Sequence, residues 1–131
     1  MTFREFFDRV YIINLAERAD RRAEVTAELE RGGMPIEPGR VEFFPAVRTR
    51  DAAGFDNPGY HGCFRSHLEI FRQAAATGVR HLLVVEDDAA LSPRFQEDEA
   101  GVVEQLRTRP WGVALLGHGG EPPANRPVEL K

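Results

Sequence analysis

Three adjacent carboxylates, Glu86, Asp87 and Asp88, directly follow the apolar run 82–85. A short apolar run of this kind is typical of a buried strand. Ligands of open α/β sheets bind outside the carboxyl ends of the strands, which is where these acids would lie. Adjacent carboxylates repel one another, and a hard divalent cation such as Mg²⁺ or Mn²⁺ removes that repulsion while it keeps positions for substrate phosphates. The segment therefore indicates a cation site, with an acidic loop that caps the following helix as the alternative.

A set of arginines follows the first apolar run, 10–15, at the start of an expected helix: Arg18, Arg21 and Arg22. Cations at a helix N-terminus oppose the helix dipole, and a bound phosphate would compensate because the guanidinium fork matches phosphate oxygens. A solvated basic face that pairs with neighbouring acids is the alternative. Asn14, at the end of the same run, could hydrogen-bond a base or a ribose, or could simply form a turn.

Cys63 and His67 are four residues apart in an expected helix and therefore share a face. They could form half of a zinc site, but the sequence has no second pair at a suitable spacing. A half-buried, hydrogen-bonded histidine is the simpler interpretation of His67, although imidazole can also transfer protons near neutral pH. His118 and Glu121 follow the last apolar run. The sequence identifies no clear catalytic base, and His67 and His118 are the candidates.

Strand and helix patterns alternate along the chain, which predicts an α/β sheet with parallel pairs and covering helices. The expected strands are 10–15, 40–47, 81–85 and 111–117, and the expected helices are 19–33, 62–78 and 92–109. The second helix carries an apolar stripe formed by Phe64, Leu68, Phe71 and Ala75. Ser92 is the expected N-cap of the third helix, with Pro93 at its first position. We expect one domain over residues 1–117 and a Gly- and Pro-rich tail over 118–131.

Composition limits the class of protein. The 131 residues are 42% hydrophobic and 29% charged, as in ordinary globular proteins, and their net charge of −4 argues against a nucleic-acid partner. The single cysteine cannot form an intrachain disulfide. No apolar run approaches the roughly 20 residues of a membrane helix, and the N-terminus lacks the features of a signal peptide. We expect a cytoplasmic protein, with peripheral attachment to the inner face of a membrane left open.

Three segments in order, "VYIINLAERADRR", "GCFRSHLEIFRQAAATG" and "HLLVVEDDA", resemble glycosyltransferase family 25. This family includes lipopolysaccharide-biosynthesis enzymes and is related to the collagen galactosyltransferases. The similarity covers about residues 9–90, and "WGVALLG" fits the strand that usually follows. The resemblance implies a GT-A-type fold, with a Rossmann-like sheet and flanking helices. It also implies transfer of a hexose, often galactose from UDP-galactose, to an acceptor hydroxyl with inversion at the sugar carbon.

The resemblance further implies roles for individual residues. Asp88 and Glu86 would hold Mn²⁺ or Mg²⁺, because "EDD" stands where the fold carries its metal-binding acids. The residues expected near the nucleotide sugar are Asn14, Leu15, Arg18, Arg22, Glu86 and Asp87. Ser66 and His67 match the "SH" pair of the family, whose role in substrate binding or packing stays open.

The chain also departs from the family pattern. Family members are considerably longer, and Tyr60 and His61 replace an acidic residue common before "GC". We therefore expect a fold truncated at its C-terminal side, which would be the donor-binding half of an enzyme whose partner is a glycan or lipid-linked acceptor. A non-catalytic homologue that acts as a binding domain is the alternative, and an unrelated metal-dependent phosphohydrolase is a third hypothesis. A homodimer would cover the sheet edge left open by truncation.

Overall fold

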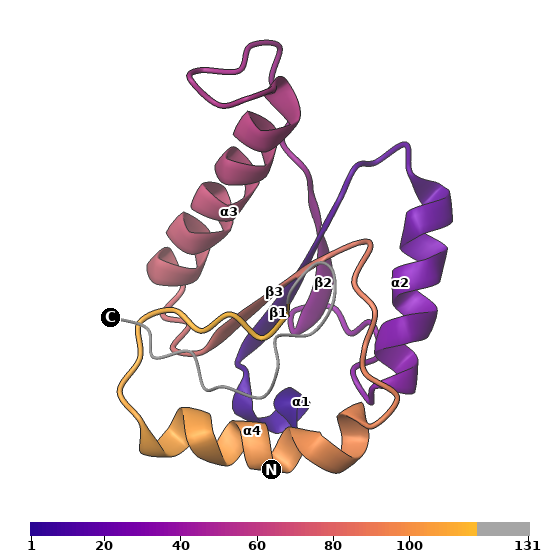
Figure 1. Ribbon diagram of the computed structural model, residues 1–131, viewed down its shortest axis with the longest axis vertical. Coiled ribbons are helices and arrows are strands. Elements are labelled where there is room, and N and C mark those ends of the chain that lie inside the picture. The colour runs from indigo at the N-terminus through magenta and orange to yellow at the C-terminus, as the bar shows by residue number, and fades with distance from the viewer. Residues whose placement is uncertain (118–131) are drawn as a thin grey trace.

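The computed structural model describes residues 1–117, and its centre is a sheet of three parallel strands (Figure 1). The strands are β1 (Arg9–Asn14), β2 (Val41–Pro45) and β3 (Leu82–Glu86), in the order β2-β1-β3. Every residue of β1 except Arg9 is buried, as expected for a central strand covered on both faces. Because all the pairs are parallel, the carboxyl ends of the three strands lie at one edge of the sheet.

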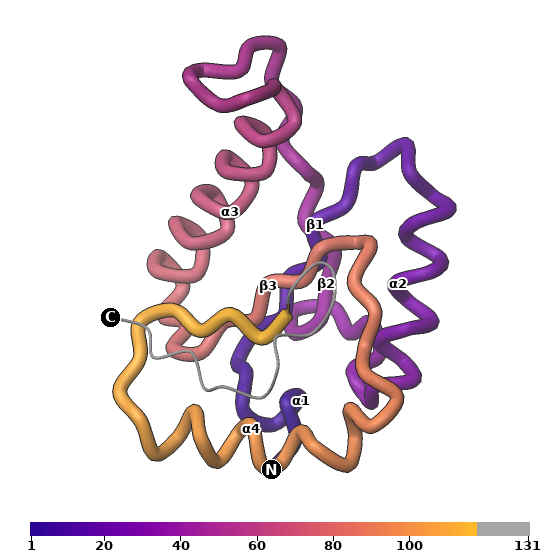
Figure 2. The backbone as a smooth tube through the Cα atoms, in the orientation of Figure 1, coloured from indigo at the N-terminus to yellow at the C-terminus, as the bar shows by residue number. Residues whose placement is uncertain are grey.

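Within residues 1–117, four helices cover the sheet: α1 (Phe3–Phe6), α2 (Ala19–Arg31), α3 (Pro58–Ala76) and α4 (Phe95–Thr108). Successive β1 side chains point to opposite faces. Val10 and Ile12 pack with residues of α1, α2 and α4, whereas Tyr11 and Ile13 pack with Ile70 of α3. The backbone tube shows α3 on the left of the strands, α2 on the right and α4 along the bottom (Figure 2). The predicted α/β class with parallel pairs and flanking helices is confirmed, and the short helix α1 was not predicted.

The face of α3 that packs on the sheet differs from the predicted stripe. Phe64 and Phe71 are 50% and 49% exposed. The buried residues recur every fourth position and are small except for one, namely Gly62, Ser66, Ile70 and Ala74. This face allows the helix backbone to approach the chain after β2 closely, which bulky rings would prevent. The helix also begins earlier than predicted, at Pro58, because the Asn57 side chain caps it by accepting a hydrogen bond from the Tyr60 N–H at 3.0 Å.

The predicted fourth strand, 111–117, is wrong: this segment has no strand structure, and within the described residues β3 pairs with β1 alone. Val113 and Leu115 are 64% and 81% exposed. Trp111 folds back at the end of α4, where its Nε1 donates a hydrogen bond to the Leu106 carbonyl at 2.7 Å, and its ring stacks on His81. The chain therefore leaves α4 without joining the edge of the sheet.

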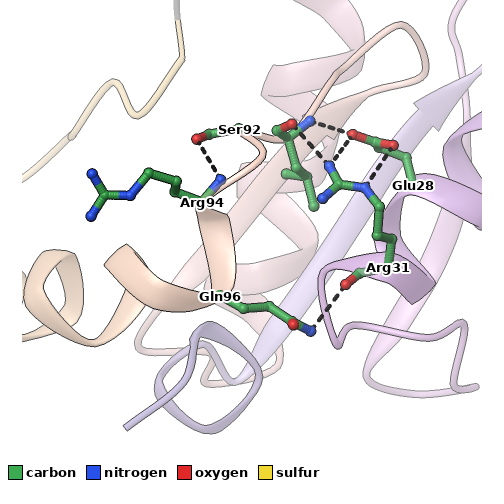
Figure 3. A network of polar contacts seen from close by, with 6 residues as sticks. Glu28, Arg31, Ser92, Arg94 and Gln96 are labelled. Carbon is green, nitrogen blue, oxygen red and sulfur yellow. Dashed lines mark hydrogen bonds and ion pairs between the residues drawn. The ribbon is translucent and has the colours of Figure 1, made fainter.

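The loop after β3 is fixed on α2 by a polar network (Figure 3). Glu28 accepts hydrogen bonds from the Leu91 N–H at 2.6 Å and from Arg31 at 2.7 Å. Arg31 also donates to the Leu91 carbonyl at 2.9 Å, and Gln96 donates to the Arg31 carbonyl at 3.0 Å. These hydrogen bonds hold the segment that follows the three acids against α2, so the path of the chain after β3 is fixed.

The start of α4 also differs from the prediction. The helix begins at Phe95 with Arg94 as its N-cap, whereas Ser92 was the expected cap. The Ser92 hydroxyl accepts a hydrogen bond from the Arg94 N–H at 3.1 Å, and its carbonyl accepts one from the Phe95 N–H at 3.0 Å. Ser92 therefore stabilises a turn that precedes the helix.

Two predictions concern membranes and the tail. Among the helices of residues 1–117, none combines the length and the apolarity that a membrane span requires. The predicted tail, 118–131, with the candidate base His118 and with Glu121, lies outside the described residues.

Candidate functional site

A pocket of about 500 Å³ lies at the carboxyl ends of the strands, where the sequence predicted a ligand site. It is lined by residues that follow β1, β2 and β3 and by the first turns of α3. This volume falls within the usual range for small-molecule sites, roughly 300–1,000 Å³. The parallel sheet thus collects chain segments that are far apart in sequence around one opening.

The acidic wall of the pocket consists of Glu86, Asp87 and Asp88, as predicted. Their side chains are held toward different elements. Glu86 accepts a hydrogen bond from Cys63 Sγ of α3 at 3.3 Å, whereas Asp87 Oδ2 accepts one from Asn14 Nδ2 of β1 at 2.9 Å. Neighbouring carboxylates are therefore drawn apart, which reduces their mutual repulsion without an ion.

The fit of these acids to a divalent cation depends on what else occupies the pocket. Within residues 1–117, no three His, Cys, Asp or Glu side chains are grouped closely enough to hold a metal ion. Mg²⁺-type ions, however, are commonly held by one or two carboxylates together with substrate phosphates and water. The hard oxygen donors of Glu86 and Asp88 fit that chemistry when a phosphate ligand supplies further oxygens.

Three arginines also line the pocket: Arg18, Arg21 and Arg48. Arg18 forms a two-pronged ion pair with Asp20 at 3.0 and 2.8 Å, which raises the pKa of Arg18 and lowers that of Asp20 well below its ordinary value. Arg48 forms an ion pair with Glu17. Three guanidinium groups facing a pocket suit a polyanionic ligand. Arg48 was not predicted from the sequence, because no motif surrounds it and only the fold brings it to the pocket.

Two predicted contact residues, Asn14 and Arg22, lie beside the pocket and not in its lining. Asn14 is 3% exposed, and Arg22 donates hydrogen bonds to Asn14 Oδ1 at 3.0 Å and to the Ala16 carbonyl at 3.1 Å. Leu15, which the family resemblance places near the nucleotide sugar, lines the pocket.

The α3 wall contains Gly62, Cys63 and Ser66. Burial, and next the hydrogen bond to Glu86, raises the pKa of Cys63 to about 11, so its thiol is neutral at physiological pH. Ser66 is buried, accepts a hydrogen bond from the Val47 N–H at 2.9 Å and donates one to the Gly62 carbonyl at 2.8 Å. Ser66 therefore both lines the pocket and packs α3 on the chain after β2.

His67 does not belong to the pocket lining. It is half-buried and hydrogen-bonded, as the simpler interpretation expected: its Nδ1 lies 2.9 Å from the Cys63 carbonyl. Its ring meets Phe71 edge to face on the outer side of α3. Of the two candidate bases, then, one lies outside the lining and His118 lies outside the described residues.

Comparison with known proteins identifies the family. The model of "Glycosyltransferase family 25 (LPS biosynthesis protein)" matches residues 58–109, which hold α3, β3 and α4. A human relative, "Inactive glycosyltransferase 25 family member 3", is 33% identical over 129 residues, which cover 85% of this chain and 22% of the relative. The chain belongs to glycosyltransferase family 25.

Some family 25 relatives are named as inactive and others are not. A Bos taurus protein, "Probable inactive glycosyltransferase 25 family member 3", is 31% identical over 85% of this chain and 22% of its own length. A Drosophila melanogaster "Glycosyltransferase 25 family member" is 26% identical over 76% of this chain and 19% of its own length. The chain thus spans about a fifth of the length of the curated relatives it matches. No solved structure matches it significantly.

Proposed function

We propose that this family 25 chain is the donor-binding part of a glycosyltransferase and binds a nucleotide sugar in the pocket at the carboxyl ends of its strands. The observation that carries the proposal is the lining of that pocket, which brings Arg18, Arg21 and Arg48 together with the three acids at the carboxyl ends of the strands. A nucleoside diphosphate is a polyanion, and it gains negative charge as the glycosidic bond breaks. Arginines that face that charge stabilise it.

The acidic wall complements this role through a cation. Asp88 and Glu86 would hold Mn²⁺ or Mg²⁺ together with diphosphate oxygens, and the ion would supply Lewis-acid stabilisation of the leaving group. The arginines bind and orient the diphosphate, and Leu15 gives the nucleotide an apolar surface. Asp87 lies between the two acids on the same wall and shapes the side of the pocket nearest β1.

The finer parts of the proposal follow the family. We propose a GT-A-type fold and a hexose donor, with galactose from UDP-galactose as the first candidate. The acceptor would be a hydroxyl of a glycan or lipid-linked glycan in lipopolysaccharide or cell-surface glycan synthesis at the cytoplasmic side of a membrane. Inverting transfer requires a base beside that hydroxyl.

Calorimetric titration tests donor binding. UDP-galactose and UDP are titrated with Mn²⁺ and without it, and Mn²⁺ is titrated alone. We expect both nucleotides to bind more tightly with Mn²⁺. Arg21→Gln and Asp88→Asn should weaken binding, whereas the exposed α4 substitutions Arg107→Gln and Asp98→Asn serve as matched controls and should not. Absence of nucleotide binding under every condition would refute the proposal.

A non-catalytic homologue is the second candidate, and the names of the human and Bos taurus relatives favour it. Such a protein could retain the pocket and the nucleotide affinity but would transfer no sugar. Transfer or hydrolysis of UDP-galactose, measured as release of UDP and abolished by Asp88→Asn, would exclude it. Nucleotide binding without release of UDP would support it.

A further inference from the structure

The buried side-chain amide of Asn14 connects one acid of the pocket, Asp87, to residues around the start of α2. Asn14 ends β1, is 3% exposed and lies behind the pocket wall. Its Nδ2 donates to Asp87 Oδ2 at 2.9 Å and to the Arg18 carbonyl at 3.2 Å. Its Oδ1 accepts from Arg22 Nε at 3.2 Å and from Arg22 Nη2 at 3.0 Å. The amide therefore links a residue after β3 to two residues around the start of α2.

The orientation of this amide is determined by its partners. A guanidinium only donates hydrogen bonds, so the group that faces Arg22 must be the oxygen. An ionised carboxylate only accepts, so the group that faces Asp87 must be the NH₂. A side-chain amide has two N–H donors and two acceptor positions, and all four are used here. Asn14 consequently has no hydrogen-bonding capacity left for a ligand.

Arg22 is itself fixed, so it can hold the amide in place. Its Nη2 also donates to the Ala16 carbonyl at 3.1 Å, and its guanidinium carbon lies 5.5 Å from the centre of the Phe43 ring of β2. A guanidinium over an aromatic face is attracted to it. Arg22 of α2 therefore contacts both the Phe43 ring of β2 and the Asn14 side chain of β1, and Asn14 in turn contacts Asp87.

We propose that Asn14 is a positioning residue, held by Arg22, that fixes the Asp87 carboxylate at the pocket wall and does not itself contact the nucleotide. The consequence for ligand binding rests on the proposed function. Outer partners that orient the ligands of a metal site typically change metal affinity or activity by about 10- to 100-fold when they are substituted, and we expect the same range for the partner of Asp87, which adjoins the two proposed metal ligands. Asn14→Asp keeps the size and shape of the side chain but replaces the donor with an oxygen that repels Asp87.

The contact itself is tested in the protein without ligand, by the side-chain amide resonance of Asn14 in ¹H–¹⁵N spectra. Removal of the carboxylate charge with Asp87→Asn should shift the resonance of the proton donated to it. Asp88→Asn, the matched substitution at the next acid, should leave it in place. A resonance that does not respond to Asp87→Asn, or responds equally to both substitutions, would overturn the proposal.

A stability measurement tests the direction of the hydrogen bond. Asn14→Asp should lower the midpoint of thermal unfolding by at least about 5 °C, since a charge-assisted bond is replaced by repulsion in a small domain. Combining it with Asp87→Asn exchanges donor and acceptor, so at least half of that loss should be recovered. Failure of the double variant to recover any of it would contradict the assigned geometry.

Nucleotide binding then separates a positioning role from a merely structural one. Asn14→Asp should weaken UDP binding in the presence of Mn²⁺ by about 10- to 100-fold. Glu99→Ala is the destabilised control, because Glu99 is a buried acid of α4 that accepts a hydrogen bond from the Phe3 N–H, which alanine cannot accept, and because it does not line the pocket. Equal weakening by both variants would overturn the positioning role. If the unsubstituted protein binds no UDP, the proposed function fails, and the amide resonance and the double variant still decide whether Asn14 holds Asp87.

Discussion

The helix α3 closely approaches the chain after β2 at Gly62, and substitution of this glycine by alanine gives a quantitative test of that contact. A Cβ atom at Gly62 would lie 2.5 Å from the Val47 carbonyl oxygen, whereas ordinary contacts are 3.4–4 Å. A backbone oxygen cannot rotate away as the end of a side chain can. The Val47 N–H is also bonded to Ser66 Oγ at 2.9 Å, so the same segment is held to α3 one turn later.

Two opposing terms determine the effect of Gly62→Ala. Alanine stabilises a helix interior by about 1 kcal/mol relative to glycine. Overpacking of a close contact destabilises by about 1–3 kcal/mol. Gly101→Ala in α4 isolates the first term, because nothing lies within 4 Å of a Cβ atom there. The difference between the two variants is therefore the steric term alone, about 1–3 kcal/mol.

Urea unfolding followed by circular dichroism measures this difference. Gly101→Ala should be about 0.5–1 kcal/mol more stable than the unsubstituted protein. Gly62→Ala should lie about 1–3 kcal/mol below Gly101→Ala, with an unchanged dependence on urea. In thermal unfolding the same gap should reach at least about 4 °C. Equal stabilisation by both substitutions would show that α3 does not pack against the chain after β2 as described.

Three further predictions concern single side chains. Ser66→Ala leaves a backbone N–H after β2 without its partner, and urea unfolding should show a loss of about 1–3 kcal/mol. Since the thiolate is the reactive form, the rate of alkylation of Cys63 by iodoacetamide should rise with pH with a midpoint near pH 11. Glu86→Gln should move that midpoint toward the ordinary thiol pKa of 9.0. A midpoint at pH 9.0 in the unsubstituted protein would contradict the buried, hydrogen-bonded thiol. Backbone N–H groups, chiefly that of His81, donate hydrogen bonds to Asp8 and lower its pKa below 3.8. The ionised Asp8 carboxylate therefore stabilises the fold above pH 3.8, and this contribution is lost as the pH falls through the lowered pKa. Thermal unfolding between pH 6 and pH 2 should therefore depend less on pH in Asp8→Asn, and an unchanged dependence would count against this linkage.

The parts of the fold that the sequence predicts correctly are those with a strong local signal. The buried run of β1 and the apolar run that ends in Glu86 have the composition of strands, and parallel pairing then places their carboxyl ends together. The position of the pocket follows from this topology. The three acids can therefore be placed at this pocket from their position in the sequence.

The buried face of α3 could not be predicted in the same way. Hydrophobicity favours Phe64 and Phe71, but the sheet-facing positions are selected for small size at a close approach. The spacing of Gly62 and Ser66 is consistent with such an approach, but the sequence does not show which segment the helix meets. The partner, Val47, is distant in the chain and becomes visible only in the fold.

The arginines illustrate the same limit at the site. Arg18 and Arg22 are four residues apart at the start of α2, which suggests the same face, yet Arg18, the N-cap residue, lines the pocket, whereas Arg22 is held by Asn14 and Phe43. Arg48 has no motif around it and still lines the pocket. Side-chain direction at a helix start depends on what packs beneath it, and in this chain that is decided by β1 and β2.

The directions of the three acids bear on how the site would work. Cys63 holds Glu86 toward α3 and Asn14 holds Asp87 toward β1, so the carboxylates diverge before any ligand arrives. The sequence indicated a cation because three adjacent carboxylates would repel one another, and their divergence reduces that repulsion. The same divergence means that the acids do not form a cluster that would bind a cation strongly in the absence of a nucleotide. A cation would then gain affinity chiefly from diphosphate oxygens. By thermodynamic linkage, the cation would raise the affinity for the nucleotide by the same factor by which the nucleotide raises the affinity for the cation. The arginines of the pocket lining favour the same order, because they attract the diphosphate whether or not an ion is present.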